Sequence, residues 1–82
     1  MPTPMTKEQY AATVREQFLE LMSNWDHDEM TQFIDSPEII KIINEEFNYK
    51  LHRLPKRQKE LTEEAYWKSC ISSLVDCLAL MA

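Results

Sequence analysis

Two helix starts and one helix end lie close together in the stretch Asp26-His27-Asp28-Glu29-Met30-Thr31-Gln32-Phe33-Ile34-Asp35-Ser36-Pro37-Glu38. Asp26 and Ser36 carry short oxygen-bearing side chains, which accept hydrogen bonds from the free N–H groups of a first helical turn. Pro37 suits the first position of a helix because its missing N–H costs nothing there. It also disfavours the helical conformation at Ser36. The stretch therefore predicts a short helix that ends in a sharp corner and is followed at once by another helix.

Two further helix starts are Thr6-Lys7-Glu8-Gln9 and Thr62-Glu63-Glu64, and the chain contains no glycine. The lack of glycine argues against phosphate-binding loops and tight strand turns, which need positive φ angles. Gln9 follows its cap by three residues, as in a capping box, and so does Glu29. We therefore expect an all-α fold, a compact bundle of three long helices and one short helix in a single domain. The expected helices cover about 7–23, 27–35, 37–54 and 63–81, after an unstructured lead at 1–5.

Apolar residues recur at helical spacing and mark the face of each long helix that we expect to be buried. The stripes are Tyr10, Val14, Phe18, Leu21, Met22 and Trp25, then Ile39, Ile40, Ile43, Phe47, Leu51 and Leu54, then Trp67, Cys70, Ile71, Leu74, Val75, Cys77, Leu78 and Met81. About half of the circumference of the last helix is apolar, which is more than a helix at the rim of a bundle needs. We expect that helix in the middle of the fold or beneath a partner.

Four apolar residues lie off these stripes, namely Leu19, Ile42, Tyr49 and Leu80. A single exposed apolar residue is ordinary in a soluble protein. Together with the broad last helix, however, the four indicate more apolar surface than the chain can bury alone. We interpret them as partner-binding residues, and we expect a homo-oligomer, in the simplest case a dimer.

Charge is divided unevenly along the chain, whose net charge is −5. Residues 1–46 carry ten acids and three bases, whereas the basic residues Lys50, Arg53, Lys56, Arg57 and Lys59 are opposed only by Glu60 in residues 47–61. These bases either contact phosphate or an acidic protein, or they are solvated and complement the end of a helix. We favour the second interpretation. A helix-turn-helix that reads DNA is rejected, because the glutamates of the recognition helix would face phosphates.

The acidic residues of the first half also allow two interpretations. They are Glu16, Glu20, Asp26, Asp28, Glu29, Asp35 and Glu38. They could form a surface that fits a basic groove on another protein, or they could be an ordinary solvated surface. We favour the ordinary surface.

The densest cluster of metal-ligand types is 26–29, with Asp26, His27, Asp28 and Glu29. Side chains on consecutive residues diverge around a helix start, and acids there complement the helix dipole. We therefore favour capping over metal binding. No serine or cysteine stands in a recognisable nucleophile motif. We expect no enzyme, no cofactor and no metal, with a metal-dependent enzyme as a remote alternative.

Cys70 and Cys77 are separated by about 10 Å along one helix, which is too far for a disulfide. We expect two buried thiols in a reducing cytoplasm. The N-terminus lacks a signal peptide, and the apolar stretch 70–82 is too short to span a membrane. The sequence therefore predicts a small non-catalytic protein-interaction module, an adaptor, regulator or inhibitor in the cytoplasm. The alternative is a nucleic-acid-associated protein that uses the basic segment 50–59.

Overall fold

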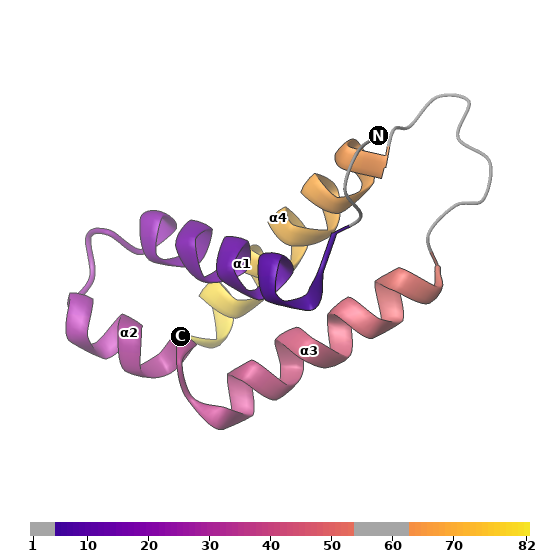
Figure 1. The fold of residues 1–82 in the computed structure, drawn as a ribbon. Coiled ribbons are helices and arrows are strands. Elements are labelled where there is room, and N and C mark those ends of the chain that lie inside the picture. The colour runs from indigo at the N-terminus through magenta and orange to yellow at the C-terminus, as the bar shows by residue number, and fades with distance from the viewer. Residues whose placement is uncertain (1–4, 54–62) are drawn as a thin grey trace.

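The structure is a computed structural model that describes residues 5–53 and 63–82. It contains the helices α1 (Lys7–Leu21), α2 (His27–Ile34), α3 (Pro37–His52) and α4 (Glu63–Met81), and no strand within those two ranges (Figure 1). Three helices are long and α2 has only 8 residues, so the predicted all-α bundle is confirmed. The first three helices end one or two residues before their predicted ends, where helices commonly fray.

Local capping explains where α1 and α2 begin. The Thr6 hydroxyl accepts a hydrogen bond from the Gln9 N–H at 3.1 Å, and the Gln9 side-chain oxygen accepts one from the Thr6 N–H at 3.2 Å. This is the predicted capping box. Asp26 accepts hydrogen bonds from the backbone N–H groups two and three residues further on, at 2.9 and 3.2 Å. The cap predicted at Thr62 lies outside the described residues.

The corner between α2 and α3 is built around Ser36. Its hydroxyl donates to the Phe33 carbonyl at 2.9 Å, which closes the end of α2. The same oxygen accepts from the Ile39 N–H at 3.4 Å, which caps α3, and Pro37 is the first residue of that helix. One residue therefore ends one helix and begins the next, as the sequence predicts.

α1 is the central helix of the bundle, with the most extensive contacts to its neighbours. Within residues 5–53 and 63–82, α1 and α3 each contact all three other helices, whereas α4 contacts α1 and α3 but not α2. The expected middle position of α4 is therefore wrong, and the alternative, that a partner covers α4, stays a prediction. Its apolar arc is broad because α4 packs against two neighbours at once, and covering both requires a wider arc than covering one.

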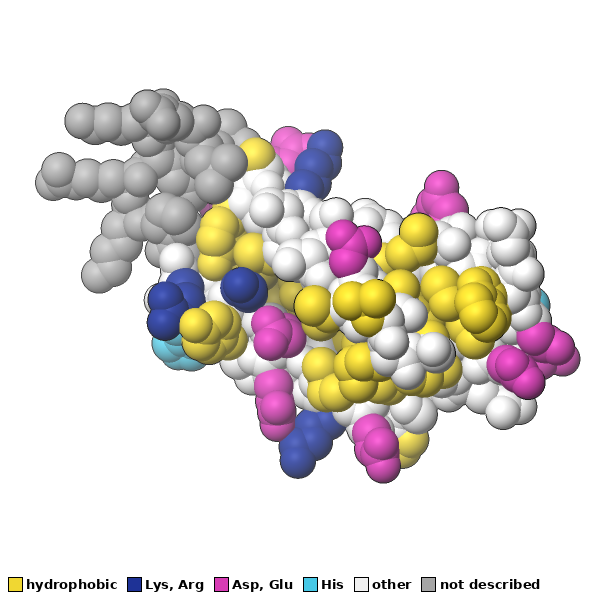
Figure 2. Space-filling view, turned by 180° about the vertical axis from the view of Figure 1, so that it is seen from behind, with side chains coloured by type: hydrophobic (Ala, Val, Ile, Leu, Met, Phe, Trp, Pro, Cys, Tyr) yellow, Lys and Arg dark blue, Asp and Glu magenta, His cyan; other side chains and the backbone are white. Residues whose placement is uncertain are grey.

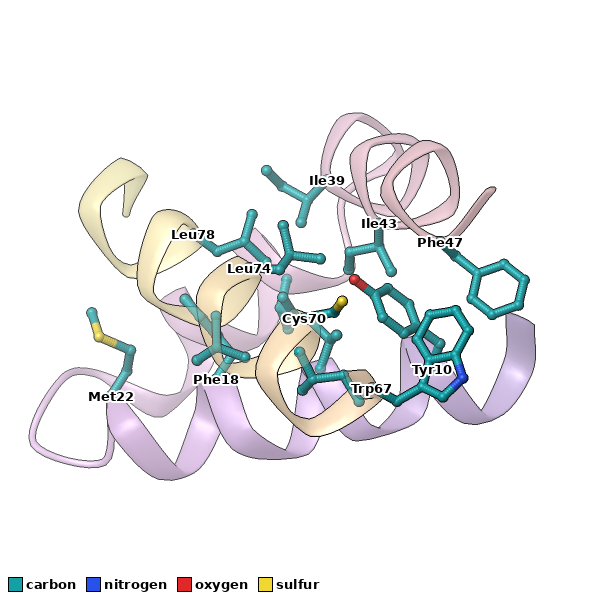
Figure 3. Close-up of a cluster of buried hydrophobic side chains, with 14 of the residues drawn as sticks. Tyr10, Phe18, Met22, Ile39, Ile43, Phe47, Trp67, Cys70, Leu74 and Leu78 are labelled. Carbon is teal, nitrogen blue, oxygen red and sulfur yellow. The ribbon is translucent and has the colours of Figure 1, made fainter. Parts of the chain in front are cut away.

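Aromatic rings join α1, α3 and α4 at one end of the core. The ring centroids of Tyr10 and Phe47 are 5.4 Å apart, those of Tyr10 and Trp67 are 5.8 Å apart, and those of Phe47 and Trp67 are 5.4 Å apart. Figure 3 shows side chains of the three helices converging on this region, with Met22 at the far end of α1. Residues 9–17 of α1 and 63–71 of α4 line one hollow, and residues 17–21 and 72–76 line the next, so α1 and α4 run in the same sense. α3 runs against them, because Lys50 near its end meets Tyr66 near the start of α4.

Several residues at the edges of the predicted stripes are exposed instead of buried. They are Leu21, Trp25, Ile40, Leu51, Cys77 and Met81. Trp25 follows the end of α1, so helical spacing no longer positions it. The others lie on flanks of helices that no other part of 5–53 or 63–82 covers. Leu54 is outside the described residues. Both cysteines are free as expected, but only Cys70 is buried.

None of the described helices combines the length and the apolar character that a membrane crossing requires.

Candidate protein-interaction surface

The outward face of the second half of α4 is exposed although it ends in large apolar side chains. Ser73, Asp76, Cys77, Leu80 and Met81 are all exposed there, with Leu80 at 88% and Met81 at 57%. We call these five residues the α4 ridge. Figure 2 shows the molecule from the side of α4, with hydrophobic side chains gathered on this face and acidic side chains around them. The ridge is therefore an apolar surface that the described chain leaves open to water.

On the α3 side of the ridge lies a groove between α3 and α4. Its lining comprises Ile42, Glu46 and Lys50 from α3 together with Cys70, Ser73, Leu74, Cys77, Leu78 and Met81 from α4. We call it the α3–α4 groove. Its walls are mainly apolar and carry one negative and one positive side chain. The groove is therefore electrically balanced.

On the other side of the ridge lies a groove between α1 and α4. Gln17, Glu20 and Leu21 of α1 face Ser72, Val75 and Asp76 of α4 across it. We call it the α1–α4 groove. Val75 is buried at its base and Leu21 is 53% exposed at its wall. Both of its charged side chains are carboxylates, so this groove is acidic where the other is balanced.

The structure divides the predicted partner-binding residues. Leu80 belongs to the ridge, Ile42 lines the α3–α4 groove, and Tyr49, 50% exposed, lies seven residues after Ile42 on α3. Leu19 and Ile42 are partly buried and pack against the core. The expectation that all four lie outside the core is therefore wrong for these two. Leu19 is not among the residues that line either groove.

Two of the predicted basic residues surround Tyr49. The Arg53 guanidinium lies 4.6 Å from the centre of the Tyr49 ring, and the Lys50 ammonium lies 5.5 Å from it. The Tyr66 hydroxyl donates to the Lys50 carbonyl at 2.7 Å and so ties the start of α4 to the end of α3. Burial raises the pKa of Tyr66. The remaining basic residues, Lys56, Arg57 and Lys59, lie outside the described part of the chain.

The predicted acidic residues are spread over α1, both ends of α2 and the start of α3. Asp26 is occupied in capping α2. Asp35 forms a two-point ion pair with Arg15, with N–O distances of 2.8 and 3.2 Å, and this hydrogen bonding lowers the pKa of Asp35. Only Glu20 of the set lines the α1–α4 groove, which Asp76 of α4 also lines. Asp76 was not among the site residues predicted from the sequence. Its signal there is that it is the single acid in the apolar stretch 70–82, four residues before Leu80.

Within residues 5–53 and 63–82, no group of three or more His, Cys, Asp and Glu side chains could hold a metal ion. Comparisons with models of protein families, with curated proteins and with solved structures find no match to this chain. Only the geometry and charge of the surface around α4 therefore bear on function.

Proposed function

We propose that this chain is a non-catalytic protein-interaction module, an adaptor, regulator or inhibitor of the cytoplasm that works by association and without a cofactor. The observation that supports this proposal is Leu80, 88% exposed on the α4 ridge with Cys77 and Met81 beside it. Large apolar side chains that remain together in water are typical of surfaces that bind another protein.

The free-energy gain from covering the ridge is substantial for a small protein. Removing one leucine or methionine side chain from water contributes roughly 1.5–3 kcal/mol. In a twofold contact each side chain is buried once per protomer, so Leu80 and Met81 contribute twice. Part of this gain offsets the loss of translational and rotational freedom on association.

We propose that the contact is a homodimer through the α4 ridge and the α3–α4 groove. A twofold interface places the same surface of both subunits together, so that surface must complement itself. The groove carries Glu46 and Lys50 on one helix, and a twofold axis lets Glu46 of each subunit approach Lys50 of its partner. Apolar walls then meet apolar walls, and opposite charges meet at the rim.

Sedimentation velocity over a concentration series tests the dimer. We expect the wild-type chain to shift from 9.8 kDa toward twice that mass as its concentration rises, and Met81→Glu to remain a monomer. Leu21→Glu is the matched control, because Leu21 is similarly exposed but lies in the other groove. Circular dichroism verifies that both variants keep their helices. A wild-type chain that stays monomeric at every concentration refutes the dimer.

A second candidate function is nucleic-acid binding by the segment 50–59. The observation in its favour is the exposed Tyr49 ring with the cations of Lys50 and Arg53 beside it. Aromatic rings combined with cations are the elements that bind single-stranded nucleic acid. The acidic residues of the same helix, Glu45 and Glu46, oppose this function.

A further inference from the structure

We propose that the α1–α4 groove binds an amphipathic helix from another protein, whose apolar side is flanked by lysine or arginine. This inference rests on the proposed protein-interaction function and names the kind of partner. The groove supplies both features that such a helix needs. Leu21 and Val75 form an apolar strip, and Glu20 and Asp76 stand on opposite helices beside it.

The shape of the groove suits a helix. α1 and α4 run in the same direction, and residues from both line the groove from Gln17 to Leu21 and from Ser72 to Asp76. Two neighbouring helices form a track in which the apolar residues of a third helix, spaced three and four apart, can lie.

The negative charge of the groove favours a partner that is positively charged. Glu20 and Asp76 form no ion pair with any residue in 5–53 or 63–82, where the recorded pairs are Arg15 with Asp35 and Lys68 with Glu64. Among the described residues, no lysine or arginine lines the groove. A basic partner would supply the missing counter-charges and would be steered toward the groove.

A second copy of this chain does not fit the same groove. A twofold contact there would bring Glu20 and Asp76 of one subunit against the same carboxylates of the other. Such like-charge contacts oppose association. The balanced α3–α4 groove suits self-association, whereas the acidic α1–α4 groove suits a different, basic partner.

A designed peptide of about 14 residues, or four helical turns, tests the inference. Leucines form one face and lysines flank it. Binding is measured by isothermal titration calorimetry with the full chain, and NMR amide shifts locate the site. We expect one peptide per protomer, with the largest shifts at Leu21, Ser72 and Asp76. A peptide with glutamate in place of lysine, and one with glutamine in place of leucine, should each bind at least about tenfold more weakly.

Charge reversal in the protein completes the test. Glu20→Lys with Asp76→Lys should weaken binding of the lysine peptide by about tenfold or more and should improve binding of the glutamate peptide. Asp28→Lys with Glu45→Lys changes the net charge equally but lies outside the groove, and it should bind the lysine peptide nearly as well as the wild type.

Three results would overturn the inference. They are absence of binding, shifts centred away from the α1–α4 groove, and equal losses in the two double variants. If the lysine peptide fails while Met81→Glu still abolishes a wild-type dimer, the inference is wrong and the interaction module stands. If neither peptide binding nor self-association occurs, both proposals are wrong.

Discussion

Tyr10 combines complete burial with a hydroxyl that has no hydrogen-bond partner among the described residues. Burial raises the pKa of Tyr10, and the neighbouring Cys70, Glu46 and Tyr66 raise it further. A buried hydroxyl without a partner loses its hydration and gains nothing in return. The aromatic ring, packed against Phe47 and Trp67, therefore accounts for the contribution of this residue to stability.

We expect Tyr10→Phe to keep or raise the free energy of unfolding, by up to about 1 kcal/mol, because it removes the unpaired hydroxyl and leaves the ring. The raised pKa also gives a pH dependence. The folded state holds the Tyr10 proton more tightly than the unfolded state, so stability falls as pH rises above about 10, the ordinary tyrosine value. Urea unfolding at several pH values should show a smaller alkaline loss for Tyr10→Phe. A strongly destabilised variant would show that the hydroxyl has a partner.

Trp67 is the residue whose truncation should lower the free energy of unfolding most. Its ring contacts those of Tyr10, Phe47 and Tyr66 and is 3% exposed. We expect Trp67→Ala to lower the free energy of unfolding by ~3–5 kcal/mol, a large part of the total for a small domain. Chemical denaturation measures the loss. A loss below ~1 kcal/mol would mean that α4 does not dock through this ring.

At the scale of elements, α1, α2 and α3 each begin at a local cap, but the orientation of every helix depends on contacts between helices. Arg15 of α1 reaches Asp35, which follows the end of α2, and so holds the corner between α2 and α3 against the central helix. Tyr66 makes a comparable link between α4 and α3 through the Lys50 carbonyl. These polar links join helix ends to neighbouring helices in addition to the contacts of the apolar core.

The Arg15–Asp35 pair is about half exposed on both sides, so its contribution is screened by water. We expect a double-mutant cycle with Arg15→Ala and Asp35→Ala to give a coupling of ~0.2–1 kcal/mol. Because the pKa of Asp35 is lowered in the folded state, the coupling is present above the ordinary aspartate value of about 4 and is lost as pH falls through the folded value. Denaturation at neutral and acidic pH checks this, and a coupling that persists in strong acid would contradict it.

For the whole molecule, the arrangement of charge separates three kinds of partner. The basic residues near Tyr49 lie at the end of α3, the balanced α3–α4 groove lies beside the ridge, and the acidic α1–α4 groove lies on its other side. The net charge of −5 disfavours association with polyanions as a whole.

We therefore expect no measurable binding of a fluorescent single-stranded oligonucleotide at physiological ionic strength, measured by anisotropy. Binding that decreases steeply with added salt would support the second candidate function instead. In that case, alanine at Lys50, Arg53, Lys56, Arg57 and Lys59 should abolish it. The matched control is Lys7→Ala with Lys41→Ala, which removes cations outside the segment.

The sequence alone determined the helical class and the places where α1, α2 and α3 begin, because caps such as Thr6, Asp26 and Ser36 act on backbone groups two or three residues away. It also indicated Leu80 as an apolar residue off its helix's buried face. Only the tertiary structure decided which flank of each apolar stripe is covered, since Leu21 and Met81 have the same spacing as buried residues but none of the described helices covers them. It alone placed Glu20 and Asp76 in one groove, because residues so far apart in the chain share a surface only through the packing of α1 on α4.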